Sequence, residues 1–169
     1  MNKTKVNLLN NLILKSKNIE YNDETLKDYL DNNKLFACYK NNNSSTVYNN
    51  GDPINFATEV VKNTSKIVKS GSNFLINHTG YLIVSFNVWL NTSGGTGRPI
   101  LRFRRSDNTD FIVCIDDNSS AYVSLSAANC IIPVTSGETF ELICETQTPQ
   151  FYVDKGASGT NSYITLELI

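Results

Sequence analysis

The sequence predicts an all-β fold: an antiparallel jelly-roll sandwich of about ten strands that follows a short N-terminal helical segment. From residue 35 onward, short runs rich in β-branched and aromatic residues alternate with clusters of Gly, Asn, Asp and Ser. These runs are nearly evenly spaced and no helical pattern separates them, which favours antiparallel pairing over a parallel α/β sheet. The longest run, 80–91, has apolar residues at all its even positions, the period of a strand that faces a core.

Residues 1–33 differ from the rest and are expected to form a helical attachment or trimerisation segment. Apolar residues recur at helical spacing over 6–13 and again over 26–30. Asn22 or Asp23 can cap the second of these stretches. Helices this short are marginal alone, so we expect them to pack on symmetry mates or on the jelly roll of the same chain.

The second domain, 34–169, is expected to be a jelly-roll head with turn-forming segments at 49–53, 93–97 and 116–119. The last strand is apolar, so it is expected to lie centrally in a sheet, because an exposed apolar edge invites aggregation. The expected strands are 35–40, 54–57, 65–69, 73–77, 80–91, 99–105, 110–116, 119–132, 139–146 and 162–169.

The odd positions of the run 80–91 point to an oligomer. They include Tyr81, Ile83, Ser85 and Trp89, which is not the charged set of a face that meets water. A sheet face with large apolar groups beside small polar ones usually contacts another protein surface. The sequence therefore predicts that both faces of this strand become buried, one in the core and one in an assembly.

Composition excludes several classes of function. The chain of 169 residues has a net charge of −1, so no nucleic-acid partner is expected. Its apolar stretches are much shorter than the roughly 20 residues of a membrane-spanning helix, so no membrane insertion is expected. The apolar segment 8–14 is interrupted by Asn10 and Asn11 and no small-residue cleavage site follows it, so no signal peptide is expected.

No metal, cofactor or catalytic group is expected. His78 is the sole histidine, and the four widely spaced cysteines form no CxxC pair, which favours reduced, buried thiols over a zinc site. The segment 116–118 contains Asp, Asp and Asn but lacks the spacing of a calcium-binding EF-hand loop. The glycine-rich segment 93–97 has no following Lys-Ser/Thr pair, so it is expected to be a hairpin connection rather than a phosphate-binding loop. The sequence shows no acid pair or nucleophile–base set, which favours a non-enzyme.

Two groups of side chains are candidates for ligand binding. Arg102 and Arg104 share a strand face and have acidic residues nearby, so they form cross-strand or intersubunit ion pairs, or bind an anionic group of a cell-surface polymer. Loops with aromatic rings, amides and acids suit carbohydrate, and such groups occur over 48–52 and 147–154. In the second loop the preferred residues are Gln150, Phe151, Tyr152 and Asp154. The alternative is that the aromatic residues of this loop cover the end of the sandwich.

Three short motifs stand out in the chain. They are Phe36-Ala37-Cys38-Tyr39, then Phe74 with Gly80, Leu82, Val84, Phe86 and Val88, then Val134 with Gly137, Glu138, Phe140 and Leu142. In this order they resemble the globular-head jelly roll of complement and tumour-necrosis-factor-like proteins, although Leu82 and Val84 stand where that family has aromatic residues. The resemblance covers about four-fifths of the chain and implies a homotrimeric jelly roll.

In the trimer that this resemblance implies, the even positions of 80–91 fill the sandwich and the odd positions face the three-fold axis. The last strand is expected to contribute outward residues to the same interface. The expected interface residues are Tyr81, Ile83, Ser85, Trp89, Tyr163 and Ile169.

Residues 18–31 are similar to a segment that precedes tip domains in phage tail, baseplate and fibre proteins. Together the two resemblances imply a non-enzymatic phage tail or virion-surface protein. Its expected partners are other tail or baseplate proteins and a host-surface glycan. A spore-surface, exosporium-like protein is the alternative, weakened by the missing collagen-like Gly-x-y region. A polysaccharide-active enzyme would need two acids converging in a groove.

Overall fold

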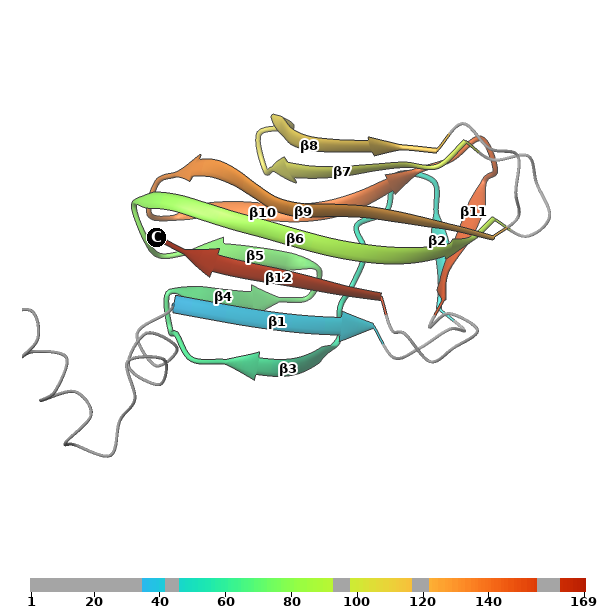
Figure 1. Ribbon diagram of the computed structural model, residues 1–169. Helices are drawn as coiled ribbons and strands as arrows, with labels where there is room; N and C mark the ends of the chain where they lie inside the picture. Colours follow the sequence, from blue (N-terminus) through green and yellow to red (C-terminus); the bar gives the residue numbers. More distant parts are fainter. Residues whose placement is uncertain (1–34, 42–45, 93–97, 117–121, 155–161) are drawn as a thin grey trace, which may run out of the picture. The chain divides into compact units, whose positions relative to one another are not determined.

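The computed structural model describes residues 35–41, 46–92, 98–116, 122–154 and 162–169. The chain divides into two units, 1–34 and 35–169, and all described residues belong to the second. The helical segment expected over 1–33 lies outside the described residues. Within the second unit, the described residues form two antiparallel sheets that pack face to face, with no helix among them (Figure 1).

The first sheet, called sheet A here, has seven strands with β6 at its centre. β9 pairs along one edge of β6. The other edge is shared, because β12 pairs with the first part of β6 and β11 pairs with its end. Beyond β12 lie β1 and β3, and beyond β11 lies β2. The strands of sheet A are β1 Leu35–Asn41, β2 Val47–Asn49, β3 Thr58–Lys62, β6 Gly80–Asn91, β9 Tyr122–Val134, β11 Gln150–Asp154 and β12 Ser162–Leu168.

The second sheet, called sheet B, has five strands in the order β4-β5-β10-β7-β8. The chain moves repeatedly between the sheets, from β5 to β6, from β6 to β7 and from β9 to β10, which is the connectivity of a jelly roll. The last strand, β12, lies between β1 and β6, so its expected central position is confirmed. The strands of sheet B are β4 Ile67–Ser70, β5 Asn73–Ile76, β7 Ile100–Arg105, β8 Asp110–Ile115 and β10 Glu138–Glu145.

The core lies between the two sheets, and β6 supplies its centre. Every even position of β6 from Leu82 to Leu90 is at most 1% exposed, as the alternating pattern predicts. From sheet B, Phe103 and Phe140 are fully buried, and their rings stack with centroids 5.4 Å apart. Offset stacking of this kind adds roughly 0.5–1.5 kcal/mol beyond area burial.

Gly80 opens β6 at a point where a side chain does not fit. A Cβ atom at this position would lie 2.7 Å from the carbonyl oxygen of Ile169. The approach is close because Tyr81 and Ile169 exchange two backbone hydrogen bonds, both of 3.0 Å. The glycine is therefore what allows the end of β12 to pair with the start of β6.

The strand expected over 54–57 is wrong. Ile54 and Phe56 are fully buried in the core, which produces the alternation, but the segment forms no strand and its start lies along the edge of β10 that β5 leaves open. The N–H of Ile54 donates to the carbonyl of Leu142 at 2.8 Å, and Pro53 forms an isolated bridge with Ile143. Strands β2, β3 and β11 were not expected from the sequence.

Candidate interaction surfaces

The outer face of sheet A, which points away from the core, collects the odd positions of β6 and their neighbours. Ile83 pairs with Glu167 of β12 on one side and with Ile131 of β9 on the other. Glu167 also pairs with Phe36 of β1, on the side of β12 that faces away from β6. Because paired residues share a face, these four side chains form one row across four strands. Tyr81 lies two positions away on the same face.

This outer face is apolar and exposed in a single subunit. It carries seven of the ten exposed large apolar side chains in the described residues. The strand registers place them there; for example, Tyr163 pairs with Asn87 and Tyr122 with Asn91 of β6. The seven, with exposed fractions, are Val47 45%, Val61 46%, Tyr81 54%, Tyr122 62%, Ile131 60%, Tyr163 41% and Ile169 56%.

The same face is depleted of charge. Strands β1, β6, β9 and β12 contain two charged residues in all, Lys40 and Glu167. By contrast, β7, β8 and β10 of sheet B contain seven: three in β7, one in β8 and three in β10. Depletion of charge around exposed aromatic and aliphatic groups distinguishes the buried centre of a protein interface from ordinary surface.

A β-bulge in β9 decides which of its residues reach this face. Val84 pairs with Cys130 and Phe86 with Ala127, so two residues of β9 lie opposite Ser85. One of the two, Asn129, has a φ of 53°, and its N–H donates to the hydroxyl oxygen of Ser85 at 2.9 Å. The residues of β9 that point to the outer face of sheet A are therefore even-numbered before the bulge and odd-numbered after it.

The structure places all six expected interface residues on the outer face of sheet A; they are Tyr81, Ile83, Ser85, Trp89, Tyr163 and Ile169. The hydroxyl of Ser85 is already used by the bulge. Trp89 is half-buried, and its indole N–H is buried with no hydrogen-bond partner among the described residues. Four further exposed residues on this face were not predicted from the sequence: Val47, Val61, Tyr122 and Ile131. Alternating apolar residues in the expected strand 119–132 were the available signal, but the bulge interrupts this alternation.

Arg102 and Arg104 lie on the outer face of sheet B and pair within the subunit. Asp110 accepts from Arg102 at 2.8 Å and from Arg104 at 2.9 Å. Glu145 lies 3.0 Å from Arg102 and 3.7 Å from Arg104. The hydrogen bond to Glu145 is the main cause that raises the pKa of Arg102. The structure therefore shows cross-strand ion pairing, and each partly exposed pair contributes at most about 1 kcal/mol.

The expected binding loop over 150–154 is instead strand β11, and Phe151 is corrected from a surface residue to a core residue. It is fully buried and stacks on Tyr48 with ring centroids 5.3 Å apart. It thus covers the end of the sandwich, which is the alternative interpretation. Gln150 is exposed and Tyr152 half-exposed, and Asp154 pairs with Trp89 at the end of the strand. A ligand at the surface cannot contact Phe151 in this arrangement.

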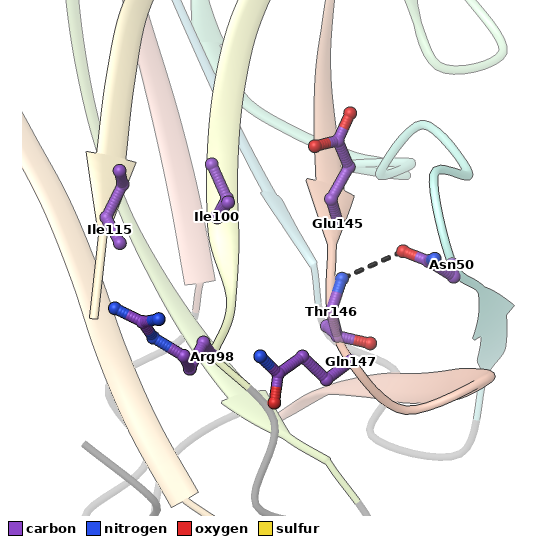
Figure 2. A pocket seen from close by; sticks show the side chains of 7 residues that line it. All are labelled: Asn50, Arg98, Ile100, Ile115, Glu145, Thr146 and Gln147. Carbon is purple, nitrogen blue, oxygen red and sulfur yellow. Dashed lines mark hydrogen bonds between the residues drawn. The ribbon is translucent and has the colours of Figure 1, made fainter. Parts of the chain in front are cut away.

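The two loops that sequence analysis selected for carbohydrate do meet, at a hollow of about 540 Å³ beside the end of sheet B (Figure 2). Asn50 comes from the first loop and Gln147 from the second. Ile100 and Ile115, paired across β7 and β8, form an apolar wall that sequence patterns did not reveal. The lining residues are Asn50, Arg98, Ile100, Ile115, Glu145, Thr146 and Gln147.

Other classes of site are not seen in the ranges that the structure describes. There, no three His, Cys, Asp or Glu side chains are grouped as metal ligands. No helix of the described residues is both long and apolar enough to cross a membrane. The four cysteines are free thiols, and burial raises the pKa of Cys144 well above its ordinary value. The second and third residues of the segment 116–118 lie outside the described residues.

No protein-family model matches the sequence, and no curated protein matches it. Solved structures do. Murine APRIL superposes with a TM-score of 0.60 at 11% identity, over 80% of this chain and 99% of that one. The Eiger TNF of S. frugiperda gives 0.59 at 14% identity, over 80% and 92%. The globular domain of zebrafish complement 1qA gives 0.53 at 14% identity, over 79% and 94%. The head therefore has the jelly-roll fold of tumour-necrosis-factor and complement globular-head proteins.

Proposed function

We propose that this chain is a non-enzymatic structural protein whose jelly-roll head forms a homotrimer through the outer face of sheet A. The carrying observation is that this face has seven exposed large apolar side chains and only two charged residues in the adjacent strands β1, β12, β6 and β9, whereas the outer face of sheet B is rich in paired charges. The jelly-roll fold supports the proposal, because the family that the sequence resembles implies a homotrimer.

The trimer follows from how the face must be covered. Contacts between different surfaces of neighbouring copies close into a ring when the rotation between them is one third of a turn. An obligate interface of this kind buries about 2,000 Å² or more in total. Tyr81, Ile83 and Ile131 would lie near the axis, because β6 and β9 carry no charged residue that such burial would have to desolvate.

Light scattering coupled to size-exclusion chromatography tests the assembly. We expect the whole chain at about 10 µM, a concentration at which an interface with a sub-micromolar Kd is saturated, to elute at three times the 18.8 kDa mass of one chain. Elution at the mass of one chain would refute the trimer.

We further propose that the trimer sits on the surface of a phage tail or a similar particle, where it binds a host-surface glycan. The resemblance of residues 18–31 to segments of tail, baseplate and fibre proteins supports this role, although these residues lie outside the described part of the chain. Gold-labelled antibodies against the head should decorate the tail tip of purified particles in electron micrographs. An absence of labelling on intact particles would contradict the particle role but not the trimer.

A further inference from the structure

We propose that the hollow beside the end of sheet B binds a neutral pyranose oligosaccharide. This inference rests on the proposed host-surface role and gives it a site and a ligand class. The hollow lies beside the paired arginines. Asn50 and Gln147, from the two loops that the sequence favours for carbohydrate, line it, but the preferred residues over 150–154 do not. Four features carry the inference: its size, its rigidity, its polar groups and its apolar wall.

The hollow is large enough and is held in shape. Its volume of about 540 Å³ falls inside the range of roughly 300–1,000 Å³ that is usual for small-molecule sites. The turn that carries Asn50 is fixed to the end of β10, because Gly51 donates to the carbonyl of Cys144 and Asn50 donates to that of Pro149, both at 2.9 Å. A preformed site loses little conformational entropy on binding.

Side-chain amides supply the polar contacts. The oxygen of the Asn50 side chain accepts from the N–H of Thr146 at 2.8 Å, so its amide nitrogen is the group directed to a ligand. Gln147 is exposed, and its side chain makes no hydrogen bond within the described residues. Figure 2 shows Gln147 extending across the hollow toward Arg98. Two amides that offer both donors and acceptors match the neighbouring hydroxyls of a sugar ring.

The apolar wall matches the other surface of a sugar ring. Ile100 and Ile115 pair across β7 and β8, and Ile115 is 57% exposed. A pyranose presents hydroxyls at its edge and C–H groups on its faces, so it can place a face on these isoleucines while its edge meets the amides. Burial of that apolar area then adds favourable free energy to the hydrogen bonds.

The charges of the lining favour a neutral ligand. It contains one carboxylate, Glu145, and one guanidinium, Arg98. Glu145 is already engaged by Arg102 at 3.0 Å and Arg104 at 3.7 Å, and Arg98 also interacts within the chain. A charged ligand would have to displace these partners, whereas a neutral one does not.

Nuclear magnetic resonance titration of the whole chain tests the site. The probes are linear trisaccharides of glucose, of mannose and of N-acetylglucosamine, with trigalacturonic acid as a charged comparison. We expect at least one neutral trisaccharide to bind with a Kd of about 1 mM or tighter, and to shift the backbone amide signals of residues 50 and 145–147. Gln147→Ala should weaken this binding at least tenfold, a factor that corresponds to about 1.4 kcal/mol.

Ile115→Asp should abolish detectable binding, because it places a charge on the apolar wall. Val113→Asp is the matched control, since Val113 is 45% exposed on the same strand and outer face but does not line the hollow. Failure of every neutral trisaccharide, equal binding by Ile115→Asp, or tighter binding of trigalacturonic acid would overturn the inference. The mass of the same samples separates the two proposals: a trimer without binding contradicts the saccharide site alone, and a monomer that binds contradicts the trimer alone.

Discussion

Ile131→Asp should convert the trimer to monomers without unfolding the head. In a single subunit the side chain of Ile131 is 60% exposed and pairs with Ile83 at the centre of the outer face of sheet A. Full burial of such a side chain is worth about 1.5–3 kcal/mol, so assembly gains about 1–2 kcal/mol at this position in each subunit. An aspartate loses that gain and adds several kcal/mol for desolvating an unpaired charge.

Three copies of the change amount to about 10 kcal/mol, or roughly seven orders of magnitude in the dissociation constant of the trimer. Light scattering at about 10 µM should then report the mass of one chain, because this concentration is far below the weakened dissociation constant. Val113→Asp makes the same change on the outer face of sheet B, where the side chain is 45% exposed, and should remain trimeric. Both variants should give the circular dichroism spectrum of the parent head, because both positions are solvent-exposed in the subunit. Ile131→Asp should unfold at a lower urea concentration than Val113→Asp, because it loses the stabilisation that assembly supplies. A trimeric Ile131→Asp variant would show that this face is not the interface, as would a monomeric Val113→Asp variant.

Three further predictions concern the head itself. Gly80→Ala should lower the free energy of unfolding in urea by about 2 kcal/mol or more, since its Cβ would meet a backbone oxygen at 2.7 Å; a loss below about 0.5 kcal/mol, the range of neutral surface changes, would contradict the steric argument. Ser85→Ala should cost about 1 kcal/mol and speed hydrogen exchange of the Asn129 amide, whose acceptor it removes; unchanged exchange would show that the bulge does not need this bond. The hydrogen bond from Arg105 holds the pKa of Asp107 well below its ordinary value, so this interaction stabilises the fold above the ordinary carboxyl pKa and is lost only as pH falls through the lowered one. Carbon NMR should find Asp107 still ionised at about pH 3, and Arg105→Ala should return the pKa of this carboxyl toward about 3.9. An Asp107 carboxyl that titrates near its ordinary pKa in the parent chain would contradict this prediction.

The fold could be predicted where the pattern within a single strand was sufficient. The alternation in β6 located both the core and the outer face, because side chains of a strand point to opposite sides whatever its partners are. β2 and β11 could not be predicted in this way. They are three and five residues long, and β11 pairs with the part of the β6 edge that β12 leaves open. Phe151 was therefore read as a loop residue when it is part of the core.

The candidate surfaces show the same limit. Ile131 was missed because the bulge at Asn129 reverses the parity of β9, and a bulge is set by pairing rather than by composition. The hollow could be predicted only in part. Asn50 and Gln147 were recognisable as residue types suited to sugar, but their meeting around Ile100 and Ile115 depends on how β7, β8 and β10 pair.

Hydroxyl-radical footprinting of the native protein tests the buried outer face most directly. In a trimer joined through the outer face of sheet A, Tyr81, Ile131 and Tyr163, which are 54%, 60% and 41% exposed in a single subunit, should be protected from labelling. Val113 and Ile115 on sheet B, at 45% and 57%, should be labelled as fast as their exposure allows. Labelling of all five residues in proportion to these single-subunit exposures would show that the outer face of sheet A is not buried.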